Sequence, residues 1–114
     1  MPRERRNISE YKSVWLFAMF DLPVDSKAAR KRYTRFRNLL LSLGFDMLQY
    51  SVYARYFASE DAAVVHRKAV KAILPPEGQV RLLSVTDRQF GKMDVFEGKS
   101  SRKPEKPPDQ LLLF

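Results

Sequence analysis

The sequence predicts an α+β domain whose strands and helices follow the order β-α-β-β-α-β. Three observations predict it: a continuous apolar run at residues 14–20, two stretches with apolar residues at helical spacing, and strand-like segments between and after them. The chain has 114 residues, of which 45% are apolar, and this is enough for one domain with one small core.

The first strand is predicted at residues 14–20, where apolar and aromatic residues are typical of a strand buried on both faces. Asp21 ends the run, and Pro23 prevents the strand from continuing. Only one face of the sheet can lie under helices, so we expect the other face of this strand to meet a second subunit. Alternation places Asp21 on that second face, together with Trp15, Phe17 and Met19.

The first helix is predicted at residues 27–44, with Asp25 or Ser26 as its N-cap and Gly44 at its end. Its apolar stripe consists of Ala29, Tyr33, Phe36, Leu40 and Leu43. A second helix should follow Ser59 and run to about Leu74, where two prolines stop it. The inward stripe predicted for this helix is Ala62, Val65, Ala69 and Ile73.

The other strands are predicted at residues 45–57 and 79–86. The first of these segments is long enough for two strands, but no Gly or Pro marks a turn within it. Thr86 and Gln89 fit a capping box, so a short helical turn through Met93 is expected. With the middle segment split, the order is that of the ferredoxin-like fold, which carries both helices on one face of its sheet.

The composition divides the chain into four parts. Residues 1–12 form a basic lead-in, and residues 13–98 form the ferredoxin-like domain. Residues 99–109 are polar and rich in proline, which is typical of a linker. Residues 110–114 contain four apolar side chains, and we expect them to form an additional C-terminal edge strand that docks on a partner subunit.

The composition also limits the chemistry. The chain has no cysteine and one histidine, His66, which excludes disulfides, thiolate metal sites, cysteine nucleophiles and histidine-cluster metal sites within one subunit. No stretch approaches the roughly 20 apolar residues of a membrane span, so we expect no membrane partner and a cytoplasmic location. The net charge of +8 favours a polyanionic partner, above all nucleic acid.

Asp21 is the first candidate for chemistry. Mg2+ prefers oxygen ligands, usually one or two carboxylates with waters and substrate phosphates. One aspartate per chain is too few, but a two-fold axis near Asp21 would supply a second, and the bridging metal would polarise a phosphodiester. The alternative is that Asp21 caps the turn ahead of Leu22 and Pro23, and spacing alone favours this alternative.

The exposed side of the first helix is the second candidate. Between Ser26 and Arg37 there are six basic residues and no acidic one, whereas solvated helices usually mix both signs. Backbone phosphate is the natural counterpart of such a surface, and a merely solvated face is the alternative. Helical projection places five of the cations opposite the apolar stripe: Lys27, Arg30, Lys31, Arg35 and Arg37.

Three tyrosines, Tyr50, Tyr53 and Tyr56, recur in the segment QYSVYARY. They would either stack on bases, as in RNA-recognition sheets, or pack in the core and at an interface. The glycine-punctuated aromatic motif of RNA-recognition sheets is absent from residues 79–86, so we interpret the tyrosines as packing residues. His66 is likewise interpreted as a half-buried packing residue rather than a general base.

Four motifs in this order resemble the CRISPR-associated protein two family. They are MFDLPV at the end of the first strand, RYTRFRNLL in the helix, GFDMLQYSVYAR after it, and LPPEGQVRLLSVTDRQFGKM. The resemblance covers roughly residues 13–98 and is closest to the form found in single-effector (type II) systems.

The resemblance implies a ferredoxin-like homodimer whose C-terminal strand crosses to the partner. It also implies that the dimer holds duplex DNA and bridges two dimers of the CRISPR integrase during spacer acquisition. Several members are described as metal-dependent nucleases acting on single-stranded RNA or duplex DNA, which implies Mg2+ or Mn2+ as the cofactor. The aspartate ending their first strand is the catalytic metal ligand, here Asp21, and Ser51 lies near the same dimer seam.

Two functions of other kinds remain open. A stand-alone, toxin-like endoribonuclease of similar fold would arrest growth on expression, and that effect would depend on Asp21. A non-catalytic RNA-binding module would bind without metal and tolerate any change at Asp21. The proline-rich linker and the terminal QLLLF favour the adaptor of spacer acquisition, because both are typical of segments that dock on a partner.

Overall fold

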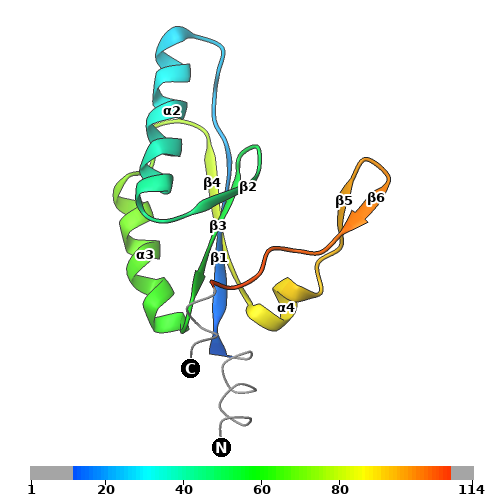
Figure 1. Ribbon diagram of the computed structural model, residues 1–114. Helices are drawn as coiled ribbons and strands as arrows, with labels where there is room; N and C mark the ends of the chain where they lie inside the picture. Colours follow the sequence, from blue (N-terminus) through cyan, green and yellow to red (C-terminus); the bar gives the residue numbers. More distant parts are fainter. Residues whose placement is uncertain (1–11, 109–114) are drawn as a thin grey trace, which may run out of the picture.

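The computed structural model describes residues 12–108 of the chain, and Figure 1 shows their arrangement. The predicted order of strands and helices is confirmed. Within the described residues, no helix is both long and apolar enough to span a bilayer. The elements are β1 (Val14–Asp21), α2 (Lys27–Ser42), β2 (Asp46–Gln49), β3 (Val52–Phe57), α3 (Glu60–Ala72), β4 (Gln79–Thr86), α4 (Asp87–Gly91), β5 (Val95–Glu97) and β6 (Ser100–Arg102).

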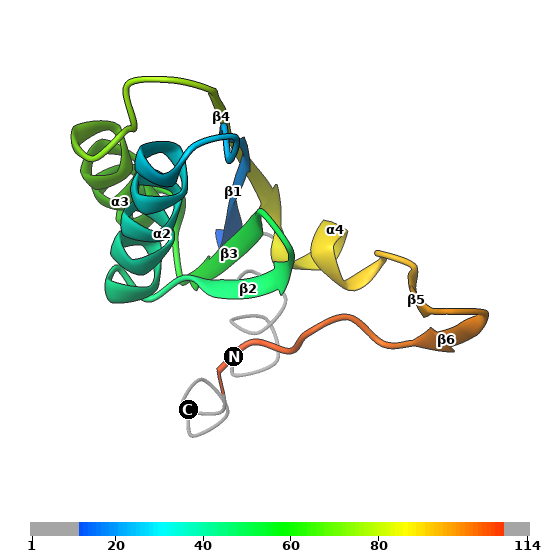
Figure 2. The same cartoon turned by 90° about the horizontal axis from the view of Figure 1, so that it is seen from above.

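The main sheet has four strands in the order β2-β3-β1-β4, and each neighbouring pair is antiparallel. Helices α2 and α3 lie side by side on one face of this sheet, as Figure 2 shows. This is the predicted ferredoxin-like arrangement. The core between helices and sheet is built from one face of β1 and the inner sides of both helices, including Leu16, Ala18, Leu40 and Val70.

Helix α2 matches its prediction closely. The Oγ atom of Ser26 accepts a hydrogen bond from the Ala29 N–H at 3.0 Å, which makes Ser26 the N-cap. The chain leaves the helix through Gly44, whose φ of +86° is a conformation that side chains disfavour. The predicted stripe is confirmed, since Ala29, Tyr33, Phe36 and Leu40 are buried and Leu43 packs against them.

The stripe predicted for helix α3 is wrong by one residue at three of its four positions. The structure buries Ala63 and Val70, while Ile73 packs at the edge of the core as expected. The cause is local ambiguity, because residues 62–65 are all apolar and permit either rotation of the helix. The observed rotation places His66 against the ring of Phe57, with the ring centroids 4.7 Å apart.

The turn that the sequence does not mark lies at Tyr50 and Ser51, between β2 and β3. Ser51 adopts a φ of +64°, an uncommon conformation for a residue other than glycine. Contacts from distant parts of the chain hold it there. The Ser51 carbonyl accepts a hydrogen bond from the Phe20 N–H at 3.1 Å, and its Oγ lies 3.0 Å from the Tyr33 hydroxyl.

The face of the sheet opposite the helices is only partly open, although the sequence leads us to expect that the part of it formed by the first strand meets a second subunit. Helix α4 packs on the part of this face that carries Trp15, near the start of β1. There Phe90 stacks on Trp15 with ring centroids 4.0 Å apart. Trp15 Nε1 also donates a hydrogen bond to Asp87 Oδ1 at 2.8 Å. Phe17 remains half-buried and Leu83 is 49% exposed, so the rest of this helix-free face is available to a partner.

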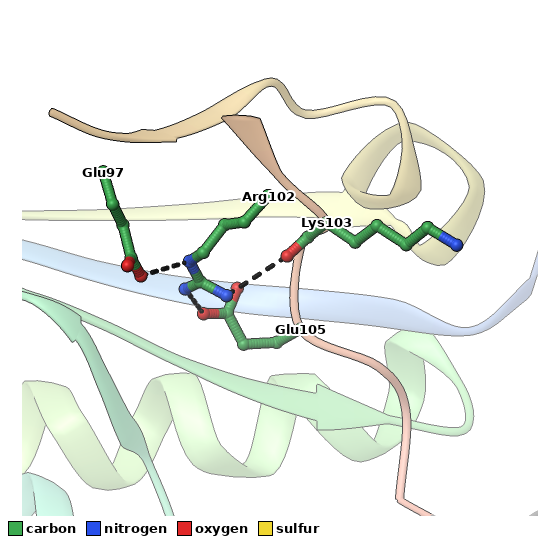
Figure 3. A network of polar contacts seen from close by, with 4 residues as sticks. All are labelled: Glu97, Arg102, Lys103 and Glu105. Carbon is green, nitrogen blue, oxygen red and sulfur yellow. Dashed lines mark hydrogen bonds and ion pairs between the residues drawn. The ribbon is translucent and has the colours of Figure 1, made fainter. Parts of the chain in front are cut away.

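Strands β5 and β6 form a small separate hairpin that projects away from the main sheet in Figure 1. Strand β6 falls inside the segment expected to be a linker. In Figure 3, Arg102 joins Glu97 at 2.9 Å and Glu105 at 2.8 Å. Exposed pairs of this kind add about 0–1 kcal/mol each, so they orient the hairpin rather than stabilise the fold. The predicted terminal strand at 110–114 lies outside the described residues.

His66 is half-buried, as predicted, and is in hydrogen-bond contact with Arg55. Burial lowers the pKa of His66, the charge of Arg55 lowers it further, and the Ala62 carbonyl acts in the opposite direction. A lowered pKa in the folded state means that the unfolded chain binds more protons below about pH 6.5. Protonation of His66 therefore favours the unfolded chain.

We expect the free energy of unfolding to fall as the pH is lowered from 7 to 5. In His66→Gln the part of this slope that comes from residue 66 should disappear, because glutamine keeps a polar partner for Arg55 without titrating. Urea unfolding at several pH values would measure both slopes. Equal slopes for the wild type and the variant would contradict this account of His66.

Candidate functional site

Asp21 is the last residue of β1 and lies directly opposite Gln79 of β4. Its neighbours Phe20 and Leu22 are both buried, whereas Asp21 itself is exposed. Two buried anchors therefore fix the backbone on either side of an accessible carboxylate. Within the described residues this carboxylate makes no hydrogen bond or ion pair, so the structure gives no support to the turn-capping alternative.

Gly78 lies in the bend just before β4 and approaches the backbone of Asp21 closely. A Cβ atom at residue 78 would lie 2.5 Å from the Asp21 carbonyl oxygen and 2.8 Å from Leu22 Cδ2. Gly78 also has a φ of +88°. Only glycine satisfies both conditions without strain. Residue 78 was not among those predicted from the sequence, where its signal is a glycine that follows two prolines and directly precedes a predicted strand.

Arg81 is a second residue that the sequence analysis missed. It is exposed, lies opposite Met19, and therefore shares the helix-free face with Asp21. The pairs Asp21–Gln79 and Met19–Arg81 are two residues apart in the ladder, which makes Asp21 and Arg81 diagonal neighbours. A carboxylate and a guanidinium at this spacing offer one group for a cation and one for a phosphate.

The predicted cations of α2 divide into two kinds. Lys27, Arg30, Lys31 and Arg35 are exposed and line a shallow hollow of about 610 Å³ along the outer side of the helix. Arg37 differs from the prediction, since it is half-buried and its Nε donates a hydrogen bond to the Tyr53 hydroxyl at 2.8 Å. It lies one turn beyond Tyr33 on the flank that faces β3, rather than opposite the stripe.

The three tyrosines differ in how far they are buried. Tyr53 is fully buried, and Tyr56 packs its ring edge-on against Trp15, so packing is confirmed for both. Tyr50 is 73% exposed and stacks on Tyr33 with ring centroids 5.5 Å apart. Burial raises the pKa of Tyr33 above its usual value, and the hydrogen bond with Ser51 acts in the opposite direction.

Ser51 lies at the same end of the sheet as Asp21, because its carbonyl pairs with the N–H of Phe20. The structure thus brings together Asp21, Ser51 and Arg81 at one end of the main sheet, with the cations of α2 on the other side of that sheet. An exposed carboxylate beside an arginine, with a separate row of cations, is suited to bind a nucleic-acid backbone and a divalent cation together.

Comparison with known proteins gives a consistent result. Residues 14–93 match the family model described as CRISPR associated protein Cas2. A protein of Parvibaculum lavamentivorans named CRISPR-associated endoribonuclease Cas2 is 50% identical, over 89% of this chain and 100% of its own length. Proteins with that name from Flavobacterium psychrophilum and Paracidovorax avenae are each 41% identical over 94% of this chain, and the matches cover 93% and 99% of their lengths.

Proposed function

Because the chain belongs to the CRISPR-associated Cas2 family, we propose that it is a homodimeric, Mg2+- or Mn2+-dependent endonuclease that also holds duplex DNA for a CRISPR integrase. The observation that carries the proposal is Asp21, an exposed carboxylate held between buried anchors beside the open part of the helix-free face. The endoribonuclease names of the relatives support phosphodiester hydrolysis. The four quoted motifs support the single-effector form of the family.

The donor set fits a metal shared by two copies rather than one held by a single chain. Within residues 12–108 there is no group of three His, Asp or Glu side chains that would hold an ion. Two copies that meet beside Asp21, with Ser51 near the seam, would supply two carboxylates, a number that suits Mg2+. The bound cation would supply charge neutralisation for the phosphodiester.

The residues of the chain have separate tasks in this proposal. The Asp21 carboxylate holds the cation at a fixed point, because Gly78 and the buried neighbours of Asp21 prevent the backbone from moving. The Arg81 guanidinium binds phosphate oxygens on the same face. The exposed cations of α2 bind the backbone of a duplex without reading its sequence.

We expect the double variant Lys31→Gln, Arg35→Gln to bind duplex DNA more weakly and with a smaller dependence on salt. Each lost phosphate contact should reduce the slope of log Kobs against log salt by about 0.9. Fluorescence anisotropy across a range of salt concentrations would measure the slope. The control is Lys68→Gln, Lys71→Gln, which removes two exposed cations from α3. If both double variants lose the same affinity and the same salt slope, the effect comes from net charge and not from the position of the cations on α2.

The adaptor role is tested by reconstituting spacer integration with the cognate integrase and duplex DNA. We expect integration to require this protein as a dimer, and analytical ultracentrifugation would establish the mass. A monomeric protein, or integration at full rate without it, would contradict the adaptor role and favour a stand-alone ribonuclease.

A further inference from the structure

Tyr50 is the most exposed of the large hydrophobic side chains in the described part of the chain, and its ring is nevertheless well positioned. One side of the ring stacks on Tyr33 with an interplanar angle of 16°. The next residue, Ser51, is fixed by its hydrogen bonds to Phe20 and Tyr33. An aromatic ring that is both ordered and exposed has already lost the freedom that binding would otherwise remove.

Two arginines lie on helix α2 about one turn before and one turn after Tyr33, the residue on which this ring stacks. Arg30 and Arg37 are three residues before and four residues after Tyr33, so they occupy the same flank of α2 as each other. The hydrogen bond from Arg37 Nε to the Tyr53 hydroxyl identifies that flank as the one facing the β2–β3 hairpin. Arg30 Nη1 is oriented by the Val24 carbonyl at 3.1 Å. Within the described residues, neither arginine is paired with a carboxylate.

We propose that Tyr50 is a stacking platform for one unpaired nucleobase, with Arg30 and Arg37 binding the phosphates on either side of that nucleotide. The ligand is a single strand, because a base stacked inside a duplex presents no face to a protein ring. The subsite adjoins the hollow along α2 through Arg30, which lines both. It also lies at the end of the sheet that carries Asp21, since Ser51 pairs with the residue before Asp21.

The subsite rests on the proposed nuclease function and adds a substrate preference to it. A strand whose base stacks on Tyr50 is held at the end of the sheet where Asp21 lies. An unpaired base near the cleaved bond should therefore be favoured over a fully paired one. A mere surface tyrosine would give no such preference.

The test uses a short RNA that contains one 2-aminopurine, whose fluorescence is quenched when the base stacks. Binding is measured in chelator, so that no strand is cut, for the wild type, Tyr50→Phe and Tyr50→Leu. We expect the wild type and Tyr50→Phe to quench the probe, and Tyr50→Leu to bind this RNA roughly tenfold more weakly without quenching. The affinity of all three for duplex DNA should be the same.

Phe96 provides the matched control, because it is also aromatic and 63% exposed but lies on β5. Phe96→Leu should quench and bind as the wild type does. The subsite is wrong if Tyr50→Leu still quenches, if it loses duplex and single-strand affinity equally, or if it changes the mass of the oligomer, which would assign Tyr50 to a subunit contact.

Cleavage of the same RNA is measured separately with Mg2+. If quenching depends on Tyr50 but the wild type does not cleave the RNA, the subsite is supported and the nuclease function is contradicted. If the wild type cleaves the RNA but quenching does not depend on Tyr50, the nuclease function is supported and the subsite is contradicted.

Discussion

Asp21→Asn is expected to reduce phosphodiester cleavage by at least about 100-fold while the protein remains folded. Asparagine has the same shape as aspartate but lacks the charge that would hold a divalent cation. The fold should tolerate the change, because the Asp21 carboxylate is exposed and has no partner within the described residues. Cleavage rates at saturating Mg2+, with thermal unfolding and oligomer mass as checks, would measure the effect.

Asp25→Asn is the matched control, since Asp25 is another exposed carboxylate four residues further along the same connection. It should cleave at the wild-type rate. If Asp21→Asn also cleaves at that rate, the metal-ligand role of Asp21 is wrong. If the variant loses cleavage but still supports spacer integration, the two activities of the proposal are separable and the adaptor does not need the carboxylate.

Gly78→Ala should lower the free energy of unfolding by about 2–5 kcal/mol, the largest loss expected for alanine at any of the four glycines. Two causes act together. The φ of +88° disfavours a side chain, and the new Cβ would lie 2.5 Å from the Asp21 carbonyl oxygen. Because relief of the clash must move Asp21 or Leu22, cleavage should fall as well. Urea unfolding and single-turnover cleavage would measure the two effects.

Alanine substitutions at two other glycines would separate the effect of backbone strain from the effect of the steric clash. Gly98 has a φ of +60° but open space around it, so Gly98→Ala should cost only about 1–2 kcal/mol of backbone strain. Gly91 has neither a positive φ nor a neighbour within 4 Å, and Gly91→Ala should be neutral or slightly stabilising. A loss in Gly78→Ala no larger than that in Gly98→Ala would mean that the close approach to Asp21 is unimportant.

The elements predicted well from the sequence are those whose pattern is local and unambiguous. Helix α2 has one apolar stripe along its length and a row of basic residues on its outer side, so one rotation both buries the stripe and exposes the charges. Helix α3 contains four apolar residues in succession at positions 62–65, and the packing of His66 on Phe57 accompanies the rotation that is observed. That contact joins a helix to a strand, and no pattern within the helix contains it.

The residues of the candidate site show the same difference between local patterns and contacts with distant parts of the chain. The position of Asp21 was predictable, because a charge directly after a buried strand is visible in the sequence itself, whereas its role as a metal ligand comes from the family resemblance and stays a prediction. Gly78 and Arg81 approach Asp21 only through the register of β4 against β1, which the sequence does not state. Arg37 was misplaced because it is four residues after Tyr33 and therefore projects only about 40° from that residue, beside the stripe rather than opposite it. The Tyr53 hydroxyl accepts a hydrogen bond from its Nε on that flank.

The contact between Trp15 and α4 has a practical consequence. Trp15 is the single tryptophan of the chain, and its indole is stacked on Phe90 and hydrogen-bonded to Asp87. Its fluorescence emission is therefore sensitive to the detachment of α4, even while the core beneath α2 and α3 stays intact. Helix α4 leads directly into the projecting hairpin, so the protein contains an intrinsic optical probe for any partner that displaces this region, without an added label.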